Sequence, residues 1–395
     1  MTLFIGTKRA RTVIDYCRFR FSTSCQDCRQ TPRKSIRDIA AWLGFGGGVL
    51  TAFGTFTTKA ETNEDLNESQ FMAKTVTDLS KLKQNKDAMR TRMELMILKV
   101  QADFCKSLQE FDDKEIIVDK WAGKRGSGGV SCIIQNGTVF EKAAILTSVV
   151  HGHLSDNAAE RLKKRRSDIR GTIIQYFAAG LSVVIHPRNP MIPTFHCNFR
   201  YFEIIDEHDK RYWWFGGGVD LTPYYLDVDD VKYFHKTLKY ACDTYNPKFY
   251  PEFKQQCDRY FYIEHRHERR GVGGIFFDDL DCLGPQGTFE FVKTCAQSII
   301  PCYSAVVKKH LTDAYGNAER QWQLLRRGRY AEFNLIYDRG TKFGLNTPES
   351  RVESVLASLP LEARWDYKHS PLPGSKEAEL IKVLVKPKDW VTDED

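Results

Sequence analysis

Between residues 130 and 218 the chain carries five runs rich in β-branched and aromatic residues, separated mostly by short polar turns. Such runs predict β-strands. Most of the gaps are too short for the crossover helices that parallel neighbours require, so the strands are expected to pair antiparallel. The predicted strands are Val130–Gln135, Val139–Val150, Thr172–Pro187, Phe195–Ile205 and Tyr212–Gly218.

Helical patterns lie on both sides of these runs, with apolar residues three to four positions apart. Two further strands are expected among the later helices, at Gly274–Asp278 and Tyr330–Tyr337. The predicted fold class is therefore α+β: a single large antiparallel β-sheet flanked by helices, in one domain over 126–395 that follows a helical N-terminal region at 61–125. The expected helices are about 60–112, 227–245, 250–266, 287–309, 314–328 and 374–384.

The first 60 residues differ in composition from the rest. Residues 1–59 hold ten of the 58 basic residues and three of the 51 acidic ones, which leaves 48 of each in the remainder. A neutral body argues against a nucleic-acid surface. Arginines interleaved with hydroxylated and aromatic residues are typical of a mitochondrial presequence. The uncharged stretch Ala40–Phe56 is too short and too rich in glycine for a convincing transmembrane helix.

We therefore predict a mitochondrial presequence and sorting segment over 1–60, addressed to the intermembrane space. A disordered tail and chloroplast import are the alternatives. The 11 cysteines form no disulfide framework, and the one CxxC pair, Cys25 with Cys28, lies in this leader without a second pair, which argues against zinc. Six later cysteines are predicted to be reduced and mostly buried: Cys132, Cys197, Cys242, Cys257, Cys295 and Cys302.

Two tryptophans and a phenylalanine run directly into three glycines and a carboxylate within Trp213–Asp220. The rings predict a flat aromatic wall, and the glycines would let the backbone approach a ligand closely. Asp220 would stand where this wall ends. An ordinary buried strand followed by a glycine-rich turn explains the same residues.

The segment Thr194–Arg200 alternates polar and apolar side chains. In a strand, His196, Asn198 and Arg200 project from one face and the residues between them from the other. An imidazole, an amide and a guanidinium each need hydrogen-bond partners if buried, so this face is expected to be wet or to line a cleft. Polar residues in the preceding strand, from Ser182 onward, favour the cleft.

A third polar site follows the run that ends at Tyr337, where Asp338 and Arg339 precede flexible glycines and, further on, Arg351. A surface turn is the simpler explanation. Taken with Arg200 and Asp220, however, the segment supplies cations for the anionic arms of a ligand and acids for its N–H groups.

These motifs, in this order, resemble oxygen-dependent coproporphyrinogen-III oxidases over roughly residues 70–395. The resemblance implies oxidative decarboxylation of two propionate side chains of coproporphyrinogen III to vinyl groups, giving protoporphyrinogen IX in haem biosynthesis, with O2 as oxidant. It implies that 126–395 is the catalytic domain of a homodimer, and it is compatible with peripheral association with the mitochondrial inner membrane. The matching stretches are SVVIHPRNP (182–190), PTFHCNFRYFE (193–203), WWFGGGVDLTPYY (213–225), ERRGVGGIFFDDL (268–280), RRGRYAEFNLIYDRGTKFGL (326–345) and SRVESVLASLPLEARWDY (350–367).

The resemblance also implies residue roles. His196 corresponds to the proton donor, and Asp220 and Asp338 correspond to acids that engage pyrrole N–H groups. The implied catalytic residues are His196, Asp338, Asp220 and Arg200; the substrate contacts are Ser182, Asn198, Phe199, Arg200, Glu349, Ser350 and Arg351; the dimer contacts are His265, Tyr330 and Arg339. Glu349 departs from the glycine usual in the family and puts a negative charge beside an anion-binding segment.

No cofactor is expected beyond O2 as co-substrate. A reduced porphyrinogen is electron-rich, and its deprotonated pyrrole can itself react with O2; the chain also lacks a GxGxxG fingerprint and a Walker loop. His186, His196, His235 and His265 match positions discussed as metal ligands in bacterial relatives, but they are scattered, so no metal is predicted. The alternative function is a non-catalytic tetrapyrrole carrier, which needs the aromatic wall and the cations but not the acids.

Overall fold

The computed structural model describes residues 66–154, 156–169, 171–346 and 350–391. Its centre is a seven-stranded sheet in the order β1-β2-β3-β4-β5-β6-β9, in which every neighbouring pair is antiparallel, as predicted. Its strands are β1 (Ile117–Ala122), β2 (Gly128–Gln135), β3 (Phe140–Gly152), β4 (Ile173–Pro187), β5 (Thr194–Asp206), β6 (Arg211–Thr222) and β9 (Gly274–Leu280); β7 (Tyr262–Ile263) and β8 (Glu268–Arg269) form a separate ribbon.

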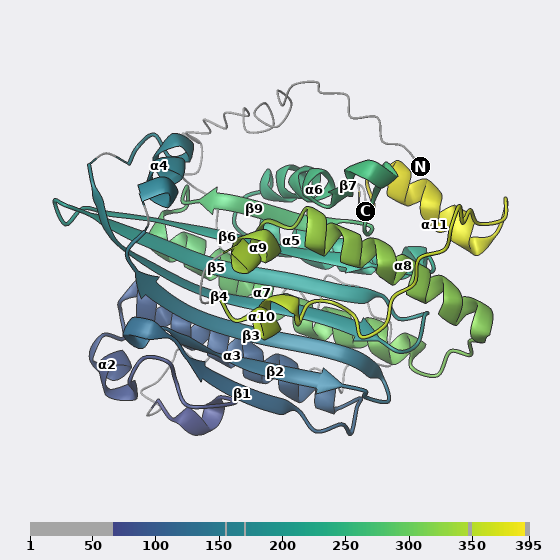
Figure 1. Cartoon of the computed structure of the whole chain (residues 1–395), viewed down its shortest axis with the longest axis horizontal. Coiled ribbons are helices and arrows are strands. Elements are labelled where there is room, and N and C mark those ends of the chain that lie inside the picture. Colours follow the sequence, from purple (N-terminus) through teal and green to yellow (C-terminus); the bar gives the residue numbers. More distant parts are fainter. Residues whose placement is uncertain (1–65, 155, 170, 347–349, 392–395) are drawn as a thin grey trace, which may run out of the picture.

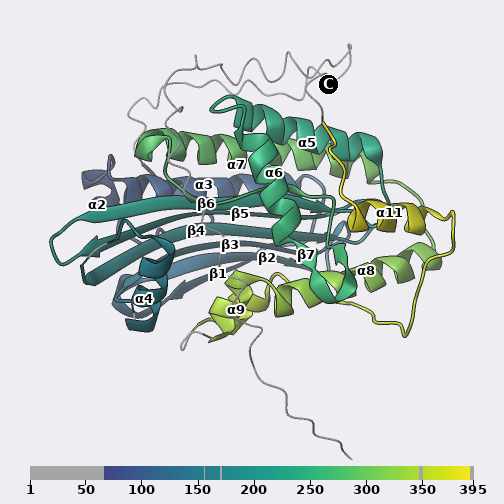
Figure 2. The same cartoon turned by 90° about the horizontal axis from the view of Figure 1, so that it is seen from above.

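Helices flank the sheet on both sides, which confirms the α+β class. Figure 2 shows α3, α5 and α7 on one side and α4, α8 and α9 on the other, and α6 packs against β9. In Figure 1, α9 and α10 lie in front of the strands. The helices are α2 (Leu79–Gln84), α3 (Met89–Gln109), α4 (Asp156–Arg165), α5 (Val228–Asp243), α6 (Phe249–Tyr260), α7 (Gly284–His310), α8 (Asn317–Ile336), α9 (Arg339–Asn346), α10 (Val352–Leu356) and α11 (Lys376–Val385).

The hydrophobic core lies between the sheet and the layer of α3, α5 and α7. Phe195, Cys197 and Phe199 of β5 are fully buried there, together with Ile97 of α3 and Ile299 of α7. Burying a large apolar side chain stabilises the fold by about 1.5–3 kcal/mol. Since alternate residues of a strand point to opposite faces, the polar residues between these apolar ones must face the other helical layer.

The N-terminal region predicted as helical at 61–125 belongs to this same core. Helix α3 contributes Ile97 and Phe104 to it, whereas Ile117–Ala122 forms the edge strand β1 and pairs with β2. The boundary predicted near residue 125 therefore does not separate two structural units.

The strand predicted at Tyr330–Tyr337 is wrong, because residues up to Ile336 form the last turns of α8. Arg326, Tyr330 and Phe333 are buried at helical spacing along this segment. Asp338 therefore follows a helix and not a strand. The helices α4 and α9 were not expected from the sequence either.

Several sequence-based predictions lie outside the described residues, namely the leader with its CxxC pair and Ala40–Phe56, and Glu349. Among the described helices, none has the length and apolar character needed to span a membrane. The six later cysteines predicted to be reduced are free and buried.

Candidate active site

On the polar face of the sheet, His196 of β5 lies directly opposite Asp220 of β6. His196 Nδ1 is 2.6 Å from Asp220 Oδ1, and the Asp220 side chain is 1% exposed. An ionised carboxylate can only accept hydrogen bonds, so Nδ1 carries the proton. His196 Nε2 then faces Asn198, whose amide nitrogen is 3.5 Å away. The His196–Asp220 pair can therefore accept or release a proton at His196 Nε2.

Asp220 has a second partner in Arg270, which donates to both of its oxygens at 2.9 and 3.1 Å. Burial alone would raise the pKa of the Asp220 carboxyl, but Arg270 and then His196 outweigh burial, so the pKa is lowered overall. Asp220 is therefore ionised and occupied by protein donors. A direct contact with ligand N–H groups, as the resemblance implies, would have to compete with them.

A row of cross-strand neighbours passes beside His196 on the same face. Ser182 of β4 is in register with Asn198, and Asn198 with Gly218 of β6. The side chains of Ser182 and Asn198 are partly exposed. In register, the whole row is Asp119, Ser131, Leu146, Ser182, Asn198, Gly218 and Phe276. This row forms a flat surface on the polar face that a flat ligand could cover.

At the β9 end of this row, three arginines lie around Asp278. Arg200 Nη2 is 2.9 Å from Asp278 Oδ1, while Arg339 Nη1 and Arg165 Nη1 are 3.3 and 4.0 Å from Oδ2. Burial raises the pKa of Asp278, but the arginines lower it overall. The side chains of Arg200 and Arg339 remain 39% and 55% exposed. The cations outnumber the carboxylate and remain accessible to an anionic ligand group.

The glycines of β6 make room for neighbouring side chains. A Cβ at Gly216 would lie 2.7 Å from the Arg200 guanidinium, and one at Gly217 would lie 2.7 Å from the Phe277 ring. Both distances are too short for a real contact, so these glycines allow Arg200 to cross β6 and Phe277 to pack below it.

The predicted aromatic wall is wrong. Consecutive strand residues alternate between faces, so Phe215 lies in the main core with Trp213 packed against it, while Trp214 lies in a separate small cluster. Trp214 is covered by Arg166, whose guanidinium carbon is 5.1 Å from the ring centroid. The same alternation corrects Phe199: its side chain is fully buried on the core side and cannot contact a ligand on the polar face.

Asp338 lies between α8 and α9. One of its oxygens accepts a hydrogen bond from Tyr260 at 2.9 Å, and the other accepts one from the Thr341 backbone N–H at 2.6 Å, which caps α9. Tyr260 stacks on Phe276 with ring centroids 4.2 Å apart, and Phe276 lies in the row described above. This stacking links the partly exposed Asp338 to the β9 side of the polar face.

Arg351 lies at the opposite end of the row, where its guanidinium pairs with Asp119 of β1. Its buried Nη1 has no hydrogen-bond partner among the described residues. Asn198 is four strands away, or roughly 19 Å at the usual strand spacing. Arg351 and Arg200 are thus placed at separate points and not on one carboxylate. Ser350 precedes Arg351 and is partly buried.

Of the three implied dimer contacts, Tyr330 is contradicted. Its side chain is 2% exposed within the single chain and packs against Arg270, so it is not available to a second chain. Arg339 belongs to the group around Asp278. His265 is exposed and is hydrogen-bonded to Tyr337 and Glu332, at 2.7 Å each; its dimer role stays a prediction.

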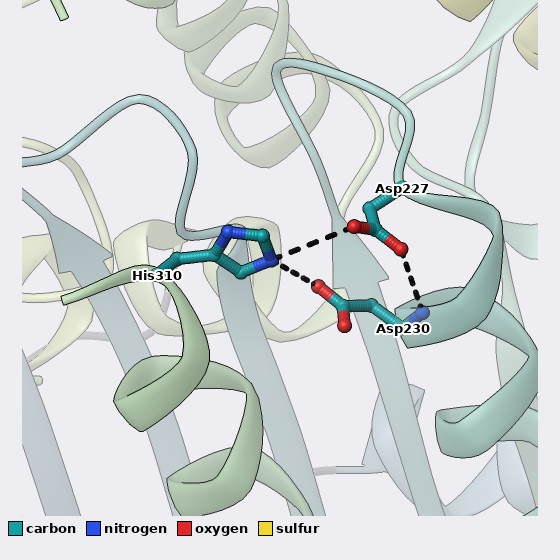
Figure 3. Close-up of side chains that lie close together, drawn as sticks. All are labelled: Asp227, Asp230 and His310. Carbon is teal, nitrogen blue, oxygen red and sulfur yellow. Dashed lines mark hydrogen bonds and ion pairs between the residues drawn. The ribbon is translucent and has the colours of Figure 1, made fainter. Parts of the chain in front are cut away.

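The four scattered histidines are each engaged separately. His186 contacts Thr194 and the Ser358 carbonyl; His235 contacts Tyr250 and the Val272 carbonyl, and burial lowers its pKa to about 3. Among the described residues, the one group with metal-ligand spacing is Asp227, Asp230 and His310, shown in Figure 3.

This group lies between the start of α5 and the end of α7, in the helical layer on the core side. Lys309 is 2.7 Å from Asp227 and 2.8 Å from Asp230, and His310 Nε2 is 2.6 Å from Asp230. The carboxylates are thus already neutralised by protein cations, and we assign no metal to them.

Three residues of the site were missed from the sequence: Arg270, Asp278 and Tyr260. The first two lie within the stretch ERRGVGGIFFDDL. Alternation within β9 could have placed Asp278 on the same face as Phe276. The contacts of Arg270 and Tyr260 join elements far apart in the chain, and no local pattern reports them.

A proton-transferring histidine with a buried carboxylate partner, on a flat polar face flanked by arginines, defines an enzyme site for a polyanionic ligand. Comparison with known proteins specifies the class. A sequence model described as coproporphyrinogen III oxidase matches residues 92–390. The chain is 53% identical over 329 residues to the oxygen-dependent coproporphyrinogen-III oxidase of Drosophila melanogaster, covering 82% of this chain and 84% of that protein.

The mitochondrial oxygen-dependent coproporphyrinogen-III oxidases of Rattus norvegicus and Homo sapiens are 54% and 53% identical over 326 residues. Each alignment covers 82% of this chain, with 74% of the rat and 72% of the human protein. The chain therefore belongs to the coproporphyrinogen III oxidase family.

Proposed function

We propose that this protein catalyses the oxygen-dependent decarboxylation of two propionate side chains of coproporphyrinogen III to vinyl groups, giving protoporphyrinogen IX in haem biosynthesis. One observation carries the proposal beyond family membership: the His196–Asp220 pair shares one sheet face with cations at both ends of a polar row. Arg200 and Arg339 lie toward β9, and Arg351 lies over β1. A flat substrate with several carboxylates suits a polar face that carries exposed cations.

In this arrangement the macrocycle lies over Ser182, Asn198 and Gly218. Guanidinium groups bind carboxylates through charge-assisted hydrogen bonds, so Arg200 and Arg351 hold different propionates. Asp338, at the β9 side, has a partly exposed carboxylate that can accept a hydrogen bond from a pyrrole N–H. These contacts fix which propionate approaches His196.

The chemistry requires a proton and two electrons to leave each reacting arm. A propionate becomes a vinyl group and CO2, and O2 accepts the electrons. A carboxylate near the pyrrole stabilises positive charge as it develops, and His196 Nε2 is the position at which the protein exchanges a proton.

The test is an assay with coproporphyrinogen III in air and under argon, read as vinyl product and CO2. We expect turnover in air, none under argon, and binding in both. Substitution of His196 by Gln serves as the inactive control, since it keeps the polar side chain but removes the proton-transfer group. Binding without turnover in air would indicate the carrier and exclude the oxidase.

We further propose that no metal, flavin or nicotinamide is needed. Support comes from the electron-rich substrate and from the separate engagement of the four histidines. Exhaustive chelation should leave the turnover number unchanged. If chelation abolishes turnover and one metal restores it, the cofactor-free mechanism is wrong.

The names of the rat and human relatives place those proteins in mitochondria, and the basic leader supports the same address here. We propose the intermembrane space as the compartment, a homodimer as the assembly and the inner membrane as a peripheral contact. Exposed apolar residues near the end of α8 and on α9 support a protein contact there: Leu335, Ile336, Phe343 and Leu345. Sedimentation of the purified protein tests the dimer.

A further inference from the structure

Arg270 lies between the polar face of the sheet and α8, where it contacts Asp220 of β6 and Asn334 of α8. Its side chain is 2% exposed, and its guanidinium carbon is 4.1, 4.5 and 4.9 Å from the ring centroids of Phe261, Tyr330 and Phe333. Removing a charged group from water costs several kcal/mol unless it is well paired. A buried arginine inside an aromatic cage therefore needs a specific partner.

That partner is Asp220. Arg270 donates Nη2 to Asp220 Oδ1 at 2.9 Å and Nε to Oδ2 at 3.1 Å, and its Nη1 reaches the Asn334 side-chain oxygen at 2.8 Å. Two parallel bonds from a planar guanidinium fix both the position and the plane of a carboxylate. A lysine, as a single rotating point charge, cannot do this.

The orientation of Asp220 in turn decides which nitrogen of His196 carries the proton. Asp220 Oδ1 is shared by Arg270 Nη2 and by His196 Nδ1. Phe261 packs edge-on against the His196 ring at 5.9 Å between centroids and also covers Arg270. The ring of His196 is thus held by one carboxylate and one aromatic residue, and Arg270 contacts both.

We propose that Arg270 is a positioning residue for the reaction: through Asp220 it holds His196 in the tautomer with its proton on Nδ1, so that Nε2 faces the polar row. In this proposal Asp220 acts through His196 and does not bind the substrate, which leaves Asp338 as the acid that faces the pyrroles. The proposal rests on the proposed function only in assuming that Nε2 is the reacting atom.

The experiment compares Arg270→Lys and Arg270→Met with Arg326→Lys. Arg326 is a matched control, because it is equally buried at 3% and pairs with one carboxylate, that of Glu268, at 2.8 Å, but it does not contact Asp220 in any described interaction. We expect both Arg270 variants to lose turnover by roughly 10- to 100-fold, the range typical when an outer partner that orients a metal-binding histidine is removed. The Michaelis constant should change little, and the pH–rate profile should shift. Arg326→Lys should leave the turnover number, the Michaelis constant and the pH–rate profile close to those of the original protein.

A second readout does not depend on activity. Nitrogen NMR of protein labelled at histidine, with the His196 signal identified by its loss in His196→Gln, should show a protonated Nδ1 in the original protein and a mixture of tautomers in the Arg270 variants. This separates the two proposals: an inactive original protein with the expected His196 signal contradicts the function alone. An unchanged tautomer in a folded Arg270 variant overturns the positioning role.

Two further results test the positioning role of Arg270 if its variants are destabilised. In a double-variant cycle, Arg270→Lys should add nothing to Asp220→Asn, because residues that act through one another are non-additive; additive losses contradict the proposal. If neither Arg270 variant folds, the isosteric Asp220→Asn alone carries the test. Loss of the Nδ1–H tautomer in it supports the relay, and its retention overturns it.

Discussion

At the residue scale, Asp338 combines two roles that a substitution can separate, since its carboxylate caps α9 and also faces the proposed substrate. Asp338→Asn keeps the shape of the side chain but removes the charge. We expect turnover to fall by about 100-fold or more, in line with the loss of one group that stabilises transition-state charge. The free energy of unfolding should change by less than about 1 kcal/mol, because Asn is also a good helix cap.

The matched control is Asp78→Asn, which changes the carboxylate that caps α2 through the Ser80 N–H and lies outside the site. Steady-state kinetics and urea unfolding of both variants check the prediction. Near-normal turnover of folded Asp338→Asn would remove this residue from the mechanism.

Arg200 should matter for binding more than its charge alone suggests. It donates to Asn198 and to Asp278, each at 2.9 Å, and a lysine cannot reproduce this fork. For Arg200→Lys we expect the Michaelis constant for the porphyrinogen to rise roughly 10- to 100-fold, which corresponds to about 1.5–3 kcal/mol for one charged hydrogen bond. Arg211→Lys, in an ion pair with Glu203 at the start of β6, is the control and should bind normally. Unchanged kinetics of Arg200→Lys would place Arg200 outside the propionate sites.

The sequence predicted part of the site because one rule is local: alternation in β5 places His196, Asn198 and Arg200 on the polar face. The approach of His196 to Asp220 depends on the register between β5 and β6, and Arg270 reaches Asp220 from a third segment. Such contacts arise from packing between distant parts of the chain and leave no periodic pattern in either part. The predicted aromatic wall does not form, because the same alternation sends the side chains of consecutive residues within 213–215 to opposite faces of the sheet.

At the element scale, the sheet was predictable and the end of α8 was not. Strand runs with short turns pair with their neighbours, so their order follows the chain. The segment from Tyr330 to Tyr337 is rich in aromatic residues, which favour strands in isolation. In the structure it continues a helix whose buried side chains lie three and four residues apart, and tertiary packing outweighs the weak local preference.

The end of α7 is tied to the start of α5 by ionisable groups, as Figure 3 shows in part. His310 Nε2 is 2.6 Å from Asp230, and its Nδ1 is 2.5 Å from Asp313. Hydrogen bonding to Asp230 is the main cause that raises the pKa of His310 above its usual value. Lys309 is held by Asp230 as well and by Asp227, and a cation at a helix C-terminus is also favoured by the helix dipole.

These ion pairs of His310 predict that the free energy of unfolding depends on pH. Because the pKa of His310 is higher in the folded than in the unfolded chain, its contribution is fully present below the unfolded value of about 6.5 and is lost as pH rises through the folded value. His310→Gln should therefore lower the free energy of unfolding by roughly 1–3 kcal/mol near pH 6 and by less near pH 8.5. Urea unfolding at both pH values measures this. The control is His208→Gln, which changes an exposed histidine; its effect on the free energy of unfolding should be the same at both pH values. An equal loss for His310→Gln at both pH values would contradict the stabilising role of its ion pairs.

At the scale of the whole molecule, charge and function separate along the chain. The net charge of +7 comes entirely from residues 1–59, and the remainder is balanced. The residues of the proposed site all follow residue 118. A leader that carries the net charge but none of the site residues has the composition of a targeting signal and not of a catalytic segment.

Deleting residues 1–60 should accordingly leave an active and nearly neutral protein, because this segment holds the net positive charge and none of the residues of the proposed site. We expect the turnover number and Michaelis constant of the purified truncated protein to match those of the full chain. In cells the truncated protein should stay in the cytosol, whereas residues 1–60 fused to a fluorescent reporter should carry it to mitochondria. A control leader with its arginines changed to glutamine should fail to do so, since presequences depend on positive charge. Mitochondrial import of the truncated protein would contradict the presequence. Failure of the truncated protein to fold would instead show that the leader contributes to the catalytic domain.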